Sequence, residues 1–160
     1  MSIRNTVKAV TICNNKILLN LCHRDGVGDY YTLPGGGQLQ YETMAQALQR
    51  ECAEETGYLV EPVGFLAMYE EIYSDPHLRQ RFPDYAHKCY HLFLCTVRDN
   101  APQQAAEPDL WQTKCVWTEL DLLDTLPVYP RTIGKALRRL IAGEGPCFLG
   151  TVILESEQPS

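Results

Sequence analysis

The residues Gly36–Tyr58, GGQLQYETMAQALQRECAEETGY, decide the fold of this chain. The run Pro34–Gly37, which overlaps the start of this stretch, interrupts helices and strands and lets the backbone approach a ligand closely. From Thr43 onward the residues are good helix formers, and Gly57 is a natural stop just past the last turn. The stretch therefore predicts a tight turn followed by a helix over Thr43–Thr56.

The charges of this predicted helix lie on the face that should be buried. Each residue of a helix is rotated by about 100° from the one before. The apolar side chains of the first half of this helix therefore share one face, and carboxylates occupy the same face in the second half. The apolar residues are Met44, Ala47 and Leu48, and the acidic ones are Glu51, Glu54 and Glu55. A glutamate run at a helix end is often only a solvated surface. Here the carboxylates repel one another and oppose the helix macrodipole, so we expect a compensating cation, and a hard divalent ion such as Mg²⁺ or Mn²⁺ suits them.

The same stretch resembles the Nudix box, the signature of the MutT-like Nudix hydrolase family. That signature is a glycine, five residues, a glutamate, seven residues, and then Arg-Glu-apolar-any-Glu-Glu-any-Gly-apolar. The fixed positions are all present, as Gly36, Glu42, Arg50, Glu51, Glu54, Glu55 and Gly57. The two apolar positions hold Cys52 and Tyr58, which are less typical than leucine, isoleucine or valine. Cysteine nevertheless behaves as a small hydrophobic residue, and tyrosine can open a strand.

The resemblance implies a role for each of these residues. Glu51, Glu54 and Glu55, together with the Gly35 carbonyl, would bind the metal ion, and Glu51 or Glu55 would also orient or deprotonate water. Arg50 and Glu42 would form a supporting ion pair that fixes the glycine turn to the helix. Gly36 and Gly57 would support the turn and the end of the helix.

The rest of the chain supplies strands and helices in an order similar to that of Nudix proteins, from about Val7 to Ala142. Strands are predicted over residues 6–13, 16–22, 30–33, 58–73, 87–97, 113–118 and 147–154, with a helical turn over 119–126 and a helix that starts at Pro130 and stops at Gly143. Asn14-Asn15 predicts a hairpin turn, and Gly64 predicts a bulge. The implied fold is α/β, an α/β/α sandwich with a mixed β-sheet, formed by residues 1–160 as one domain.

Two further features have a functional and a structural explanation. The segment Ser74–Tyr85 is expected to be an irregular insert that either contacts a substrate or a second copy of the chain, or is simply exposed. His87 and His91 lie on one side of a predicted central strand, where they either bind a metal ion or are packed and hydrogen-bonded.

Composition limits the cellular context. The chain has 160 residues, a net charge of −6 and a pI of about 5.2, which argues against binding to a nucleic-acid polymer. Neither a signal-peptide pattern nor an apolar run of membrane-spanning length is present in the sequence. The seven cysteines include no C-x-x-C pair, so we expect buried or free thiols rather than zinc ligands or disulfides, and a cytoplasmic protein.

The substrate is less well defined than the chemistry. The resemblance implies hydrolysis of the pyrophosphate linkage of a nucleoside diphosphate derivative, such as a nucleotide sugar or ADP-ribose. The alternatives are a nucleoside triphosphate pyrophosphohydrolase and a non-catalytic nucleotide-binding module. Arg24 either meets a substrate phosphate or lies at a solvated hairpin end. A homodimer is compatible with the sequence.

A further acid that many family members use in a later loop is missing at the expected place. Trp111 occupies the position six residues before Trp117, where a glutamate would be expected. The nearest acids are Glu107 and Asp109, and Glu107 is a candidate substrate-binding residue. The identity of the general base therefore stays open.

Overall fold

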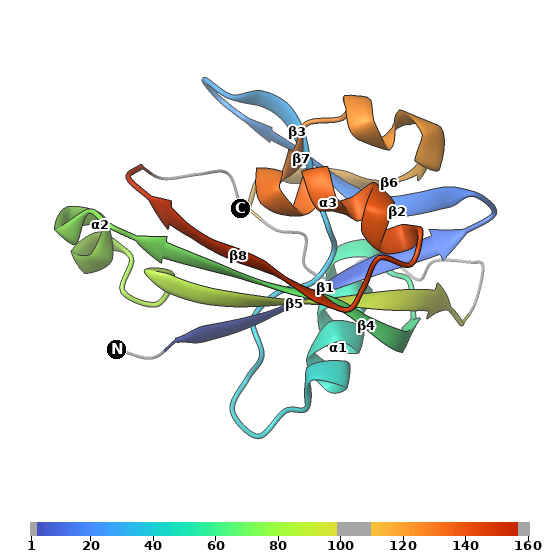
Figure 1. Ribbon diagram of the computed structural model, residues 1–160, viewed down its shortest axis with the longest axis horizontal. Helices are drawn as coiled ribbons and strands as arrows, with labels where there is room; N and C mark the ends of the chain where they lie inside the picture. Colours follow the sequence, from blue (N-terminus) through green and yellow to red (C-terminus); the bar gives the residue numbers. More distant parts are fainter. Residues whose placement is uncertain (1–2, 99–109, 157–160) are drawn as a thin grey trace.

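A computed structural model describes residues 3–98 and 110–156 (Figure 1). The strands are β1 (Arg4–Cys13), β2 (Lys16–Arg24), β3 (Gly28–Thr32), β4 (Val60–Tyr73), β5 (His87–Val97), β6 (Gln112–Glu119), β7 (Val128–Tyr129) and β8 (Cys147–Leu154). The helices are α1 (Met44–Thr56), α2 (Pro76–Arg81), the 3₁₀ helix η1 (Leu120–Thr125) and α3 (Arg131–Ile141).

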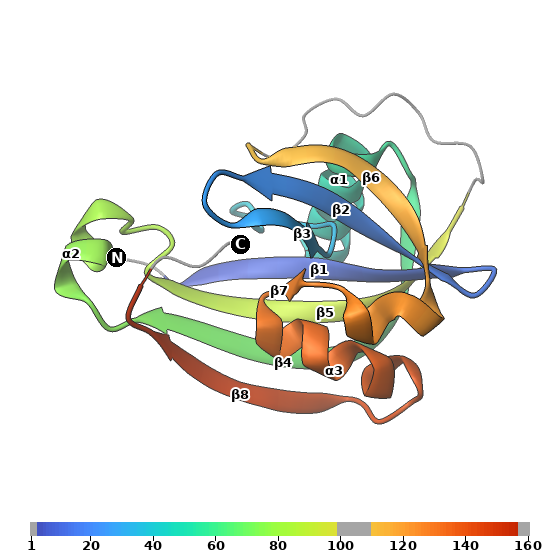
Figure 2. The same ribbon diagram turned by 90° about the horizontal axis from the view of Figure 1, so that it is seen from above.

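The strands form one mixed, curled sheet in the order β7-β3-β2-β1-β5-β4-β8, and β6 also pairs with β2. β1 runs parallel to β5, and β4 runs parallel to β8, whereas β4 and β5 are antiparallel. Figures 1 and 2 show α1 and α3 on opposite sides of this sheet. The α/β/α sandwich with a mixed sheet is therefore confirmed.

Helices α1 and α3 each cover a separate apolar core. The side chains of α3 at i, i+3, i+4 and i+7 are buried against β1, β2, β4 and β5, and they are Ile133, Ala136, Leu137 and Leu140. On the other face, Ala47, Leu48 and Cys52 of α1 pack against Val7 of β1 and Val60 of β4. Cys52 is fully buried, as expected of a small hydrophobic residue in the apolar position of the box.

The first hairpin forms where the two asparagines predict it. Asn14 and Asn15 have φ values of 48° and 61°, the left-handed values that a type I′ turn requires at both central residues. Cys13 therefore lies opposite Lys16, and β1 and β2 are antiparallel. This hairpin fixes which face each side chain of β1 meets, because one residue of slippage would exchange the two faces.

The boundaries of most helices and strands lie within two residues of those predicted from the sequence, and β5 and β8 have the predicted bounds. Gly64 lies at a register shift between β4 and β5, which confirms the predicted bulge. The expectation of an irregular insert over Ser74–Tyr85 was wrong, because it contains α2. The Asp75 side chain accepts a hydrogen bond from the His77 backbone N–H and caps this helix. Pro130 is the N-cap of α3 rather than its first residue.

Candidate active site

Helix α1 is fixed at both ends by local hydrogen bonds, which place its glutamates. At the N-terminus the Thr43 side chain accepts from the Gln46 N–H at 3.2 Å, and the Gln46 side chain accepts from the Thr43 N–H at 2.9 Å, a reciprocal capping box. At the C-terminus Gly57 has a φ of 74° and donates its N–H to the Ala53 carbonyl at 3.0 Å. A residue with a Cβ would be strained at that φ, so glycine ends the helix at this point.

The glycine turn is held against β1 by backbone hydrogen bonds. Val7 N–H donates to the Gly36 carbonyl at 2.9 Å, and Ala9 N–H donates to the Pro34 carbonyl at 2.8 Å. Gly35 has a φ of 121°, and a Cβ there would lie 2.2 Å from the Val7 carbonyl oxygen. A Cβ on Gly36 would lie 2.3 Å from Glu51 Oε2. The missing side chains therefore allow the turn to approach both β1 and the Glu51 carboxylate.

Glu55 is the deepest of the box carboxylates, with only 3% of its surface exposed. Its Oε2 accepts hydrogen bonds from Asn20 Nδ2 of β2 at 2.8 Å and from the Gly35 N–H at 2.9 Å. Gln112 Nε2 of β6 donates to the Glu55 carbonyl at 2.8 Å. The end of α1 is thereby attached to the turn and to two strands, and the contacts of Asn20 and Gln112 were not predicted from the sequence.

Arg50 uses all five of its N–H donors within the box. Its Nε and Nη2 bind the Glu42 carboxylate in a bidentate pair at 2.9 and 3.0 Å, and Nη2 also donates to the Gly37 carbonyl at 3.0 Å. Nη1 donates to Glu51 Oε1 at 2.8 Å and to Glu54 Oε2 at 3.1 Å. The predicted Arg50–Glu42 ion pair is present in this geometry, and it connects the turn to the helix.

The electrostatics of this pair favour its charged form. The hydrogen bond from Arg50 is the largest factor that lowers the pKa of the Glu42 carboxyl, and the Leu39 N–H donates to Glu42 as well. The same hydrogen bond raises the pKa of the Arg50 guanidinium. Both groups are therefore charged throughout the neutral range.

A buried lysine lies at the turn. Lys8 of β1 is 9% exposed, and its Nζ donates a hydrogen bond to the Gly35 carbonyl oxygen, the oxygen predicted to bind metal. A carbonyl oxygen has two lone pairs, so this hydrogen bond leaves one acceptor position. Lys8 was missed from the sequence, although a lysine between the apolar Val7 and Ala9 of a predicted strand was a visible signal.

These residues border a cleft of about 610 Å³. One wall carries the turn and the box side chains, which are Gly35, Gly36, Gly37, Arg50, Glu51, Glu54 and Glu55. Three cations, Arg4, Lys8 and Lys88, also border the cleft. Two groups of aromatic side chains also border the cleft. The first group, close to α2 in the sequence, is Tyr73, Phe82 and Tyr85. The second group, in or next to β3, β6 and β7, is Tyr30, Trp111 and Tyr129.

The donor set fits a divalent cation. Glu51, Glu54 and Glu55 carry carboxylate oxygens beside the cleft at one helix end, a donor type that suits Mg²⁺ or Mn²⁺. Because Gly36 has no side chain, the turn lies close to Glu51 Oε2. Arg50 binds the other oxygen of this carboxylate, Oε1. In the geometry described here Arg50 draws Glu51 and Glu54 toward itself, so a bound ion would compete with the guanidinium for these carboxylates.

The structure does not place either predicted substrate-binding residue, Arg24 or Glu107, among the described residues that border the cleft. The Arg24 guanidinium lies 4.8 Å above the Trp111 ring, and of these two residues Trp111 borders the cleft. Glu107 and Asp109 lie outside the described residues. The role of Arg24 at a phosphate therefore stays a prediction.

A buried acid that contacts two cleft residues, Lys88 and Tyr90, was not recognised from the sequence. Glu71 of β4, only 3% exposed, lies 2.8 Å from Lys88 Nζ and accepts hydrogen bonds from the Tyr69 and Tyr90 hydroxyls, each at 2.9 Å. Burial, with the Glu71 carboxylate nearby, raises the pKa of both phenols, so they keep their protons and donate. Of this network, Lys88 and Tyr90 border the cleft.

The comparisons with known proteins identify the family and the fold. The NUDIX domain family model matches residues 3–140. A NUDIX hydrolase structure from Nitrosomonas europaea is 22% identical and has a TM-score of 0.72, with 96% of this chain and 81% of that chain covered. A comparison with curated proteins gave no match.

Two further structures are similar. An ADP-ribose pyrophosphatase from Streptococcus suis 89-1591 is 20% identical with a TM-score of 0.58, over 94% of this chain and 98% of that chain. A MutT NUDIX hydrolase from Burkholderia pseudomallei is 25% identical with a TM-score of 0.58, over 76% of this chain and 86% of that chain.

This chain belongs to the Nudix family, because the family model covers most of its length. It is a Nudix hydrolase, and enzymes of this class act on phosphoric anhydride bonds of small nucleotides and generally depend on a divalent metal ion. Among the described residues, none of the helices is long and apolar enough to cross a membrane.

Proposed function

We propose that this chain hydrolyses the pyrophosphate linkage of a nucleoside diphosphate derivative of the nucleotide-sugar or ADP-ribose kind. The observation that carries the proposal is the presence of two aromatic groups in one cleft with the box. Figures 1 and 2 place α2, next to the first group, at one end of the molecule and β3, β6 and β7 away from it. A substrate with a ring at each end and a pyrophosphate between them suits this arrangement, whereas a nucleoside triphosphate has a nucleoside at one end only.

The box residues would hold the metal ion and orient the reactants. Glu51, Glu54 and Glu55 are the ligands in this proposal, with the Gly35 carbonyl as a further one, and the ion is Mg²⁺ or Mn²⁺. Once bound, such an ion would neutralise phosphate charge and activate water for attack on phosphorus. Arg50 holds the helix to the turn through Glu42 and the Gly37 carbonyl, so the carboxylates keep their place as the substrate binds.

Cations in the cleft would attract the diphosphate. Arg4, Lys8 and Lys88 border the cleft, and the charges of Arg4 and Lys8 offset the acidic wall for a polyanionic substrate, whereas the charge of Lys88 is balanced by Glu71. Glu51 or Glu55 would accept the proton of the attacking water or orient it. Because Glu55 already accepts from Asn20 and the Gly35 N–H, Glu51 is the more accessible of the two.

The neighbouring structures support the class of reaction. One of them is named an ADP-ribose pyrophosphatase, and another is named a MutT hydrolase. At 20% identity the likeness to the ADP-ribose pyrophosphatase concerns the fold alone. The proposal of a nucleotide-sugar substrate is therefore supported by the aromatic groups of the cleft. The MutT name keeps nucleoside triphosphates as the second candidate.

A substrate panel with identified products tests the proposal. Purified chain would be incubated with Mg²⁺ and ADP-ribose, nucleotide sugars, dinucleoside polyphosphates or nucleoside triphosphates. We expect the highest kcat/KM for an ADP-ribose or nucleotide-sugar substrate, with addition of one water to give a nucleoside monophosphate and a sugar phosphate. Preferred release of pyrophosphate from a triphosphate would favour the second candidate. Tight nucleotide binding without any hydrolysis would indicate the non-catalytic module.

Two aromatic variants test the two-ended cleft. Tyr85→Leu and Trp111→Leu should each raise KM for the preferred substrate about 10-fold, since ring stacking contributes about 1–3 kcal/mol. Tyr41→Leu is the control, because Tyr41 is 95% exposed and is not part of the cleft wall. If only one of the two cleft variants changes KM, the substrate meets one aromatic group and the two-ended account is wrong.

A further inference from the structure

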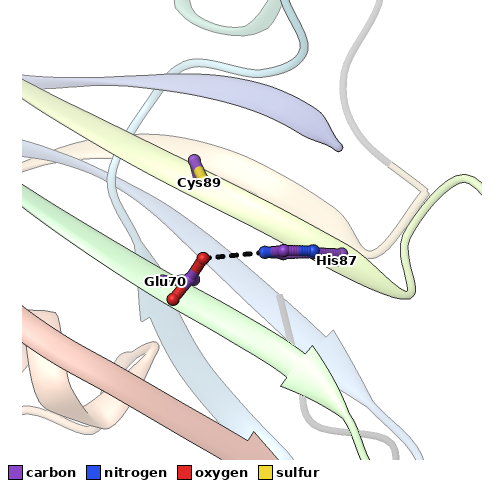
Figure 3. A group of neighbouring side chains, drawn as sticks. All are labelled: Glu70, His87 and Cys89. Carbon is purple, nitrogen blue, oxygen red and sulfur yellow. Dashed lines mark hydrogen bonds and ion pairs between the residues drawn. The ribbon is translucent and has the colours of Figure 1, made fainter. Parts of the chain in front are cut away.

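Glu70 of β4 and His87 and Cys89 of β5 form a cluster of possible metal ligands (Figure 3). Lys88 and Tyr90 border the cleft and contact Glu71 there. Because successive side chains of a strand point to opposite faces, His87 and Cys89 of β5 and Glu70 of β4 must face the other way. The cluster is therefore separate from the box and from every residue assigned to hydrolysis above.

The cluster is assembled by strand pairing rather than by a sequence motif. Glu70 lies directly opposite Cys89 in the antiparallel β4–β5 pair, and His87 is two residues before Cys89 on the same strand. One ligand atom from each of the three side chains lies within 4.8 Å of the other two. Ligands that come from two strands give no C-x-x-C spacing, which explains why the sequence favoured free thiols alone.

Polar contacts orient two members of the cluster. His87 Nε2 lies 2.7 Å from Glu70 Oε1, so His87 is hydrogen-bonded in this structure, and the contact also aims both side chains at the same point. The other carboxylate oxygen, Glu70 Oε2, accepts a hydrogen bond from Thr151 Oγ1 of β8 at 2.6 Å. The His87 and Glu70 side chains are 31% and 23% exposed, so an ion could enter from solvent without unfolding the strands.

We propose that Glu70, His87 and Cys89 bind a Zn²⁺ ion. An imidazole nitrogen, a thiolate sulfur and a carboxylate oxygen are the three ligand types that proteins use for zinc, and the sulfur favours zinc over the hard Mg²⁺ or Mn²⁺ of the box. Cys89 binds as the thiolate, and its proton passes to solvent when the ion binds. Three protein ligands leave the fourth position for a water molecule.

The position of the site defines its structural consequence. The ion would join β4 to β5, and Thr151 would orient the Glu70 ligand from β8, the last strand in the sheet order. Cys89 and Glu70 lie on adjacent strands that are already hydrogen-bonded, so binding requires only side-chain adjustment. Zinc at this point would therefore stabilise one end of the sheet without entering the cleft.

Cobalt spectroscopy with zinc competition tests the site on the untagged full chain. Co²⁺ bound by a thiolate gives a sulfur-to-metal charge-transfer absorption that oxygen ligands do not give, so the box cannot produce it. We expect this band in the wild type, its removal by one equivalent of Zn²⁺, and its loss in Cys89→Ser and His87→Ala. Cys147→Ser is the matched control, because Cys147 is also a partly exposed free thiol and should leave the band unchanged.

Two further variants make the result specific. Thr151→Val keeps the side-chain shape and should weaken Zn²⁺ binding about 10- to 100-fold, the usual effect of removing a partner that orients a ligand. Glu54→Gln/Glu55→Gln should leave the charge-transfer band, and its removal by Zn²⁺, unchanged, because the band reports only the metal ion bound to Cys89. If Cys89→Ser unfolds, as circular dichroism would reveal, Glu70→Gln takes its place and must weaken binding. The absence of a charge-transfer band in the wild type, or its persistence in Cys89→Ser, would overturn the proposal.

Discussion

Two groups of charged residues, the box and the network around Glu71, contribute side chains to the same cleft, and they differ in charge balance. At the Glu71 network a single carboxylate is matched by one ammonium group from Lys88 and by two tyrosine hydroxyls. At the box the carboxylates of Glu42, Glu51 and Glu54 share one guanidinium from Arg50, and Glu55 adds a fourth carboxylate at the same helix end. Even with Lys8 beside the turn, the box keeps an excess of negative charge.

This difference separates a structural role from a functional one. A buried charge that is fully paired and hydrogen-bonded gains nothing from a further ion, whereas clustered carboxylates with one shared cation are stabilised by one. Two of the box carboxylates are also more accessible than Glu71, with Glu54 35% and Glu51 18% exposed. We therefore expect substitutions at the box to change metal dependence and activity, and substitutions at the Glu71 network to change stability.

The largest effect is expected for Glu55→Gln. The change removes one ligand charge at constant volume and keeps an oxygen that can accept from Asn20 and the Gly35 N–H. We expect kcat/KM to fall about 1000-fold, which corresponds to about 4 kcal/mol of transition-state stabilisation. Steady-state kinetics with Mg²⁺ measures the loss, and an unchanged circular dichroism spectrum controls for the fold. Turnover like that of the wild type would refute the assignment of Glu55.

At the Glu71 network, Lys88→Met should act on stability. It leaves a carboxylate that is only 3% exposed without its cation, which costs about 4 kcal/mol in the free energy of unfolding. The double variant Glu71→Gln/Lys88→Met should recover most of this loss, because no uncompensated charge remains. Urea unfolding checks both values. A single variant as stable as the wild type would show that the pair is not a structural element.

Gly35 and Gly36 also allow an effect on stability to be separated from an effect on metal binding. A Cβ at Gly35 meets the backbone of β1 at a φ of 121°, so Gly35→Ala should lower the free energy of unfolding by about 3 kcal/mol. A Cβ at Gly36 meets only the end of the flexible Glu51 side chain, so Gly36→Ala should displace that carboxylate and weaken Mg²⁺ binding while the fold stays stable. Thermal unfolding and Mg²⁺ titration of both variants distinguish these outcomes. Equal losses of stability would argue against the contrast.

The smallest expected effect depends on pH. Because Arg50 lowers the pKa of Glu42 in the folded state, the ion pair contributes stability that is fully present above the unfolded value of about 4.5 and is lost as pH falls below it. The difference in Tm between the wild type and Glu42→Gln should therefore be largest near neutral pH and shrink in acid. Thermal unfolding across pH 3 to 7 measures this difference, and a constant difference would contradict the pairing.

Local signals predicted much of the fold. The boundaries of α1 follow from Thr43 and Gly57, which act within one turn of the chain, and the hairpin follows from Asn14 and Asn15. Helix α2 was missed, although Asp75 followed by Pro76 is a typical helix start, because the surrounding prolines suggested a loop. The two-residue strand β7 is too short to give a periodic pattern.

The site was predictable only where its residues are close in sequence. The box lies on one turn and one helix, so its spacing could be recognised in the sequence. Lys8 and Asn20 join it from β1 and β2, and the Glu71–Lys88 pair depends on how β4 pairs with β5. Such contacts depend on strand register across distant segments, which the sequence of either strand alone does not specify.

A metal-binding titration tests the central claim most directly. Mn²⁺ would be titrated by calorimetry into the wild type, Glu54→Gln/Glu55→Gln and Glu71→Gln, each shown to be folded. The excess negative charge at the box predicts that the wild type and Glu71→Gln bind Mn²⁺ alike and that the double box variant loses this binding. Equal binding by the double box variant, or loss in Glu71→Gln alone, would contradict the account.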